Sequence, residues 1–170
     1  MRLAALTLAV FVLAGCGGSA KVATPTVGSD GSLNVAIKVL KHGKQVIALV
    51  PVTIDGKGPY NFAIDTGASQ SLVDSSVAKK LHVPATGDKH RVAGITDVTQ
   101  VKTLVVRHWS VGGVRLPKAT VVETNLPFGN ADGGVQGLLG SDMLSQFDVI
   151  TIDYDHQVLR LHHRAVKSHG

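Results

Sequence analysis

One stretch of the chain decides how the rest can fold: Asn61-Phe62-Ala63-Ile64-Asp65-Thr66-Gly67-Ala68-Ser69-Gln70-Ser71. It begins with an apolar run, residues 62–64, whose composition favours a β-strand. The small and polar residues that follow Asp65 favour a tight loop over a continued strand. The stretch therefore predicts a carboxylate at the mouth of a buried strand, which is a suitable place for a catalytic acid.

Length and composition set the class of fold. The 170 residues suffice for one domain with a short appendage. Hydrophobic residues make up 44% and charged residues 17%, which is typical of a globular chain and not of a disordered one. Nineteen glycines and many valines, threonines and isoleucines favour strands and turns. We therefore expect an all-β fold, mainly β with one or two short helices.

The first fifteen residues predict a signal peptide. Arg2 supplies a positive charge, and the apolar run over residues 3–13 is too short to span a bilayer. The run ends in Leu13-Ala14-Gly15-Cys16, which resembles a bacterial lipobox, where the cysteine is acylated and becomes the new N-terminus. Cys16 is the only cysteine, so no internal disulfide can form. The alternative is an ordinary secretory signal with an incidental cysteine.

The remaining chain divides into three parts. Residues 16–32 are small, polar and interrupted by Pro and Gly, which predicts a flexible tether that carries a lipidated Cys16. We expect the folded domain to span residues 33–164 and residues 165–170 to form a disordered tail. The export signal and the lipobox together predict a protein of the cell envelope, lipid-anchored to a membrane and facing the periplasm or the exterior.

Charge argues against nucleic acid as a partner. Removal of residues 1–15 deletes Arg2 and lowers the formal net charge from +5 to +4. The lysines and arginines are scattered and are not interleaved with aromatic residues in a patch. Because an export signal also precedes the domain, we expect no nucleic acid partner. The milder interpretation of the net positive charge is weak attraction to anionic lipid or wall polymers.

Strand patterns and turn signals alternate on both sides of Asp65. Before it, we expect strands over 35–40 and 46–54, a turn at 41–44, and a turn at 55–59 that leads by a hairpin into 60–64. After it, we expect a helix over 75–81 that Asp74 or Ser75 caps and Pro84 ends. Further along we expect a hairpin over 89–102 turning at Ala93-Gly94, strands at 104–111, 114–116 and 119–122, and a closing hairpin of 147–154 with 158–161.

A second informative stretch lies near the end of the domain: Val135-Gln136-Gly137-Leu138-Leu139-Gly140-Ser141-Asp142-Met143-Leu144. Two glycines flank the Leu-Leu pair, which lets an apolar strand cross close to another backbone. Asp142 before Met143 and Leu144 predicts a short helix with Asp142 as its cap.

The two stretches together resemble the retropepsin-like aspartic protease family. The resemblance is carried by Asp-Thr-Gly-Ala-Ser after an apolar strand and by the later Leu-Leu-Gly, and it spans roughly residues 46–161. It implies a closed β-barrel lobe of the acid-protease kind. It also implies that Leu138, Leu139 and Gly140 thread behind the catalytic loop and support it.

The resemblance implies an aspartic endopeptidase that acts on polypeptide. It assigns catalysis to Asp65, Thr66 and Gly67, with Thr66 bonding across a dimer and Gly67 admitting substrate or the partner's backbone. It assigns substrate contacts to a further set of residues, namely Ala68, Ser69 and, at the tip of a flap, Gly94.

The chemistry needs two carboxylates, and the chain has a single Asp-Thr-Gly. The resemblance therefore implies a homodimer in which Asp65 of each subunit meets on a two-fold axis. Two carboxylates about 4 Å apart repel by roughly 4 kcal/mol at an effective dielectric of 20, which separates the two ionisations by about three pKa units. Such a pair holds one proton over a broad acidic window, so activity should favour mildly acidic pH.

The chain departs from the viral members of the family at two positions. Those members have Asp two residues after the Gly of the first motif and Arg directly after the Gly of the second, and the two form an ion pair that supports the site and the dimer. Here the positions hold Ser69 and Ser141. Both charges are absent together, so none is left unpaired, but that support for the dimer is missing too.

The protease has alternatives. One alternative is a non-catalytic retropepsin-like lipoprotein that binds a peptide or a wall component. The eight histidines lack metal-ligand spacing, and we find no nucleophile elbow and no phosphate loop, so we expect no metal and no cofactor. Asp142 and Asp153 are candidates for a second carboxylate within the chain, but a helix cap and a turn are the better interpretations.

Overall fold

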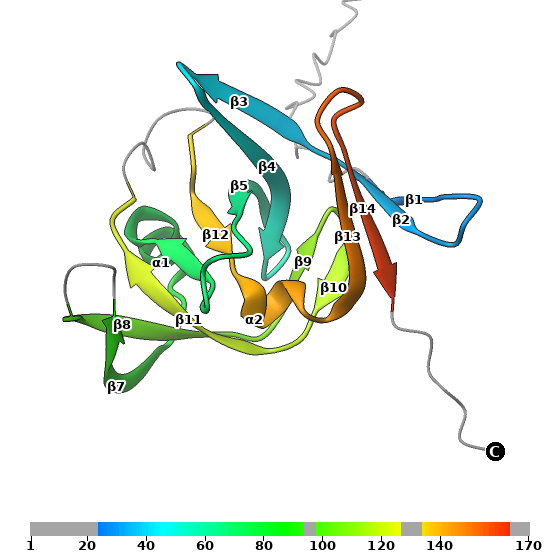
Figure 1. The fold of residues 1–170 in the computed structure, drawn as a ribbon. Helices are drawn as coiled ribbons and strands as arrows, with labels where there is room; N and C mark the ends of the chain where they lie inside the picture. The colour runs from blue at the N-terminus through cyan, green and yellow to red at the C-terminus, as the bar shows by residue number, and fades with distance from the viewer. Residues whose placement is uncertain (1–23, 94–97, 127–133, 164–170) are drawn as a thin grey trace, which may run out of the picture.

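The structure is a computed structural model that describes residues 24–93, 98–126 and 134–163 (Figure 1). The predicted signal peptide, Cys16, Gly94 and the tail lie outside the described residues. Within the described ranges the fold is mainly β with two short helices, as we expected. No helix in these ranges is long and apolar enough to cross a membrane.

The smaller of the two described sheets joins the two ends of the domain. Its four strands lie in the order β1 (Thr26–Val27), β2 (Leu33–Ala36), β14 (Val158–His163) and β13 (Phe147–Asp153). The closing hairpin that the sequence predicted is β13 with β14. β1 pairs with β2, with Thr26 opposite Asn34. Paired structure therefore begins seven residues before residue 33, inside the segment that we predicted to be a tether.

The larger sheet positions the site. In the described residues it has ten strands, and its path runs β10-β9-β4-β5-β12-β6-β11-β8-β7, with β3 paired to β4. Figure 1 shows this sheet strongly curled, with β12 in its middle. The strand bounds are β3 Lys38–His42, β4 Gln45–Ile54, β5 Lys57–Ile64, β6 Leu72–Asp74, β7 Ala85–Ala93, β8 Val98–Val106, β9 Trp109–Val111, β10 Val114–Leu116, β11 Ala119–Thr124 and β12 Gly137–Leu139.

Two predictions before Asp65 need correction. The single strand over 35–40 is wrong, because β2 pairs in the smaller sheet and β3 in the larger one. The buried Ile37 lies at the crossing and donates its N–H to the carbonyl of Gln157 at 3.0 Å. The turn over 55–59 is also too long. The β4–β5 hairpin closes over Asp55-Gly56 alone, and both residues have positive φ, 49° and 72°, as a two-residue hairpin turn requires.

The turns and hairpins after the helix follow the predictions more closely. A continuous strand over 104–111 is wrong, because it divides into the end of β8, which pairs with β11, and β9, which pairs with β4. Strands β7 and β8 form the hairpin expected over 89–102, and it is longer than expected, because it begins at residue 85 and ends at 106. Strands β9 and β10 pair across Gly112-Gly113, whose φ angles are 52° and 88°.

The two helices are capped differently from one another. α1 (Ser75–Leu81) begins at Asp74, whose side chain accepts the Ser76 N–H, and it buries the apolar face that the sequence predicted. It ends at His82 in the left-handed region, so Pro84 does not end it. α2 (Ser141–Leu144) has Gly140 as its N-cap residue, which corrects the assignment of Asp142 as the cap.

β12 lies between β5 and β6, the two strands that flank the Asp65 loop, and pairs with both. It runs parallel to β5 and antiparallel to β6. A Cβ on Gly137 would lie 2.3 Å from the ring of Phe62, which is fully buried. Only glycine therefore allows β12 to pack flat against β5. Gln136 secures the approach, since its N–H donates to the Asn61 carbonyl at 2.7 Å and its side chain accepts the Asn61 N–H at 3.1 Å.

Asp74 joins the start of α1 to the segment that follows β11. The residue is 3% exposed, and its carboxylate accepts hydrogen bonds from the Ser76 N–H, the Ser76 hydroxyl and, at 2.8 Å, the Leu126 N–H. Burial raises the pKa of Asp74, but these hydrogen bonds outweigh burial and hold its pKa below 3.8. The folded state therefore binds the proton more weakly than the unfolded chain does.

Asp74→Asn should flatten the loss of stability in acid. Because the folded pKa lies below the unfolded value, the contribution of Asp74 is present above about pH 4 and is lost as pH falls through its folded pKa. We expect the variant to be less stable at pH 7 and to lose less stability between pH 4 and pH 2, measured by urea unfolding. Asp155→Asn, in an exposed turn, is the matched control. Equal slopes for the Asp74 variant and the wild type would contradict this assignment.

Candidate active site

Asp65 lies directly after β5 on a loop that is tied to β12. Its N–H donates to the Leu139 carbonyl at 3.0 Å. Its Oδ1 accepts the N–H of Gly67 at 2.9 Å, and its carbonyl accepts the N–H of Ala68 at 3.3 Å. The residue is nevertheless exposed. The geometry thus presents a carboxylate to solvent on a backbone that is held in place.

The rest of the loop is open on one side. Thr66, Gly67 and Ser69 are exposed and Ala68 is half-buried. A Cβ on Gly67 would lie 3.2 Å from Oδ1 of Asp65, so the glycine keeps space beside the carboxylate. Gly94, the predicted flap residue, lies outside the described residues.

The Leu-Leu-Gly segment lies directly against this loop. Leu138 is half-buried, Leu139 is 1% exposed and Gly140 is buried. A Cβ on Gly140 would come within 2.8 Å of the Ala68 carbonyl oxygen and of the Gln70 carbonyl carbon. The two backbones therefore approach more closely than any side chain at position 140 would permit.

Ser141 ties the two segments together with neutral groups. Its N–H donates to the Ala68 carbonyl at 2.8 Å, and its hydroxyl donates to the same oxygen at 3.0 Å. Sequence reasoning identified Ser141 only as the position where an arginine was missing. The structure shows that the serine holds the loop itself, within one chain.

Two residues that the sequence did not pair, Ser71 and Asp142, meet behind the loop. Ser71 is fully buried, and its hydroxyl donates to Oδ1 of Asp142 at 2.7 Å while it accepts the Gly140 N–H at 3.0 Å. Ser71 and Asp142 are 71 residues apart in sequence. No local pattern links them, and the position of Asp142 near a helix start suggested a cap instead.

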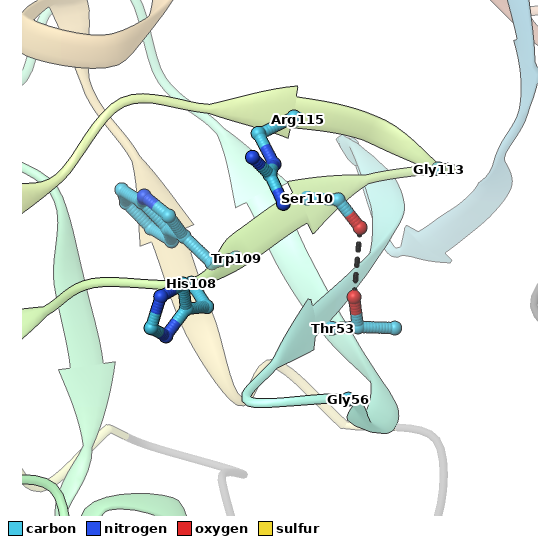
Figure 2. A pocket seen from close by; sticks show the side chains of 7 residues that line it. All are labelled: Thr53, Gly56, His108, Trp109, Ser110, Gly113 and Arg115. Atoms are coloured by element: carbon cyan, nitrogen blue, oxygen red, sulfur yellow. Dashed lines mark hydrogen bonds between the residues drawn. The ribbon is translucent and has the colours of Figure 1, made fainter.

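A separate pocket of about 240 Å³ lies over the β4–β5 turn and the β9–β10 hairpin (Figure 2). Its lining residues are Thr53, Gly56, His108, Trp109, Ser110, Gly113 and Arg115. The hydroxyls of Thr53 and Ser110 are 2.7 Å apart and bond to one another. Gly56 and Asp65 flank opposite ends of the eight-residue β5, nine residues and roughly 30 Å apart at about 3.3 Å per residue. This pocket is therefore not part of the Asp65 site.

Metal chemistry finds no support in the described ranges. Among residues 24–93, 98–126 and 134–163, no group of three or more His, Cys, Asp or Glu side chains lies close enough to hold a metal ion.

Residues 50–143, more than half of the chain, match the protein family described as "Aspartyl protease". This chain belongs to the aspartyl protease family. Its fold is also similar to the crystal structure of a retropepsin-like aspartic protease from Rickettsia conorii, with a TM-score of 0.51 and 18% identity over 79% of this chain and 94% of that one. That likeness confirms the retropepsin-like fold. No curated protein matches the chain in sequence.

In this member of the aspartyl protease family, hydrogen bonds support the loop. The ion pair of the viral members is replaced by hydrogen bonds from Ser141 to Ala68, and by the contact of Ser71 with Asp142 and Gly140. Only one member of these contacts, Asp142, is an ionisable group. The crossing of the two segments is therefore held mainly by neutral hydrogen bonds.

Gly140→Ala should destabilise the protein by about 1–3 kcal/mol, because the new methyl meets backbone atoms that can move only with the whole loop. Chemical denaturation of the variant and the wild type measures the loss. Ser145→Ala, an exposed position just after α2, serves as the control and should change stability by less than about 0.5 kcal/mol. A Gly140→Ala protein as stable as the wild type would show that the crossing is looser than described.

Proposed function

We propose that the protein is an aspartic endopeptidase that hydrolyses peptide bonds as a homodimer, with Asp65 of each subunit supplying one carboxylate. The observation that carries the proposal is the exposed Asp65 at the end of β5, with its backbone bonded to Leu139 and its Oδ1 to Gly67. Membership of the aspartyl protease family supports the same chemistry. Thr66 and Gly67 complete the proposed catalytic motif.

The reaction divides its proton transfers between the two carboxylates. The ionised one takes a proton from water while the water oxygen attacks the carbonyl carbon of the substrate. The protonated one gives its proton to the carbonyl oxygen. When the tetrahedral species breaks down, the C–N bond cleaves and the leaving nitrogen takes up the proton removed from water. As the carbonyl re-forms, one hydroxyl of the tetrahedral species returns its proton to the carboxylate that had protonated the carbonyl oxygen. The dyad thus returns to its singly protonated state without a cofactor.

In this proposal the second carboxylate comes from another chain. Asp142 is bonded to Ser71 and Asp153 to His156 and Arg160, at 2.7, 3.0 and 3.1 Å, so both are committed to contacts of their own. The sequence holds one Asp-Thr-Gly. The exposure of Thr66 and Gly67 in the single chain agrees with a face that a second copy covers.

The substrate in this proposal is an extended polypeptide. Main-chain pairing holds a strand-like peptide of any sequence, and pockets for alternate side chains select among peptides. Ala68 and Ser69, on the open side of the loop, would contact this peptide. The β7–β8 hairpin would cover it as a flap, with Gly94 at the tip.

We further propose that the protein works in the cell envelope. Residues 1–15 would direct export, and acylation of Cys16 would anchor the chain to a membrane. Nine residues separate Cys16 from Thr26, the first residue of β1, and reach at most roughly 30 Å. The protease lobe would therefore stay close to the bilayer that holds its anchor.

Asp65→Asn should abolish proteolysis. The amide can neither take the proton from water nor deliver one, so we expect at least a hundred-fold loss of cleavage of an unfolded protein substrate at pH 4 to 6. The assay uses chain lacking residues 1–16, which retains every described residue. Asp155→Asn is the matched control and should cleave as the wild type does. Equal cleavage by the wild type and the Asp65 variant would rule out this mechanism.

Sedimentation of the same protein tests the dimer. We expect a reversible monomer–dimer equilibrium, with specific activity rising with protein concentration because a single chain holds half of the dyad. A strict monomer that still cleaves would contradict the shared active site. A strict monomer that binds peptide without cleaving it would favour the non-catalytic alternative, a retropepsin-like lipoprotein that binds a peptide or wall component.

A further inference from the structure

The hydroxyl of Ser71 has both of its hydrogen-bonding functions in use. It lies at the end of the Asp65 loop and is fully buried. One lone pair accepts the Gly140 N–H at 3.0 Å, and the hydroxyl hydrogen points to Oδ1 of Asp142 at 2.7 Å. A buried hydroxyl with one donor and one acceptor partner has a single favourable orientation.

Asp142 sets that orientation. A carboxylate accepts hydrogen bonds and does not donate them, so Ser71 must direct its hydrogen towards Asp142 and its lone pair towards Gly140. Without an acceptor at position 142, the hydroxyl hydrogen loses its buried partner and can turn towards Gly140, where it would meet another donor. The pair therefore acts as a relay that runs from Asp142 through Ser71 to the backbone of Gly140.

Gly140 is the residue through which the relay reaches Asp65. Its two neighbours in sequence both hold the loop: the Leu139 carbonyl accepts the Asp65 N–H, and Ser141 donates twice to the Ala68 carbonyl. Gly140 itself lies too close to the loop to admit a Cβ. A shift of Gly140 would therefore move both ends of the turn that carries the carboxylate.

We propose that Ser71 and Asp142 are positioning residues for the Asp65 carboxylate. This inference rests on the proposed function and adds two residues to it, neither of which touches the substrate. It requires a hydroxyl at position 71 and a hydrogen-bond acceptor, charged or neutral, at position 142. Misplacement of a catalytic group by about 1 Å is enough to cost on the order of a hundred-fold in rate.

The test compares kcat and KM of four variants with those of the wild type, on dimeric protein lacking residues 1–16. Ser71→Ala and Asp142→Ala break the relay, and we expect kcat to fall between about ten- and a hundred-fold with KM changed less than about three-fold. Asp142→Asn keeps an acceptor and should recover most of the rate. Ser145→Ala lies outside the relay and should leave the rate unchanged.

Two results would overturn the proposal. One is a Ser71→Ala protein that is less stable but keeps the wild-type kcat per folded dimer, because that outcome describes a purely structural contact. The other is an Asp142→Asn protein as slow as Asp142→Ala, since the carboxylate would then act by its charge and not as an acceptor.

A second measurement separates this inference from the proposed function. Amide hydrogen exchange at residues 65–70 reports the order of the loop whether or not the protein cleaves peptides. We expect faster exchange in Ser71→Ala and Asp142→Ala, and wild-type exchange in Asp142→Asn. If the wild type has no peptidase activity, the proposed function fails, and unchanged exchange in Ser71→Ala would then show separately that the relay does not hold the loop.

Discussion

The structure depends on one close approach between two backbones that are far apart in sequence. Gly140 lies against Ala68 and Gln70 at distances that leave no room for a methyl group. On either side of this contact, the Asp65 N–H bonds to Leu139 and the Ala68 carbonyl to Ser141. The strand β12 can reach this point because Gly137 lets it pack flat on the ring of Phe62. The loop that carries the carboxylate is therefore an extension of the core packing and not a free surface turn.

The same crossing explains how the site can do without the charged support of its viral relatives. When either group of a buried ion pair is removed or neutralised, the other charge is left buried without a partner, which costs stability. Hydrogen bonds from serine to a backbone carbonyl do not titrate. For a proposed enzyme of mildly acidic pH, the neutral hydrogen bonds of Ser141 keep the loop in place over the range where carboxylates begin to take up protons.

The carboxylates of the described residues also divide by task. Asp74 and Asp153 are held in hydrogen bonds that lower their pKa values, that of Asp153 to about 2, through the N–H and side chain of His156 and the guanidinium of Arg160. These two carboxylates stabilise the fold. Asp142 serves Ser71, and Asp65 is left exposed, with its Oδ1 bonded to the N–H of Gly67. Of these four, Asp65 alone is exposed, and it lies in the Asp-Thr-Gly motif. An aspartic dyad needs two such carboxylates, which is the physical reason to propose a dimer.

The sequence by itself determined the elements that depend on local patterns. The strand into Asp65, the Gly112-Gly113 hairpin, the helix with Val77, Ala78 and Leu81 inward, and the closing hairpin all follow from periodicity and turn chemistry over a few residues. Family resemblance through two short motifs led correctly to the retropepsin-like fold.

Only the tertiary structure decided what depends on contacts between distant residues. The break at Ile37 arises because two sheets compete for one extended segment, and the pattern of that segment is the same for either. Asp142 reads as a helix cap in sequence, and becomes a partner of Ser71 only because β12 brings α2 under the loop. A hydrogen bond between residues 71 positions apart produces no periodic pattern in the sequence. The contacts that support the candidate site are therefore evident only in the folded chain.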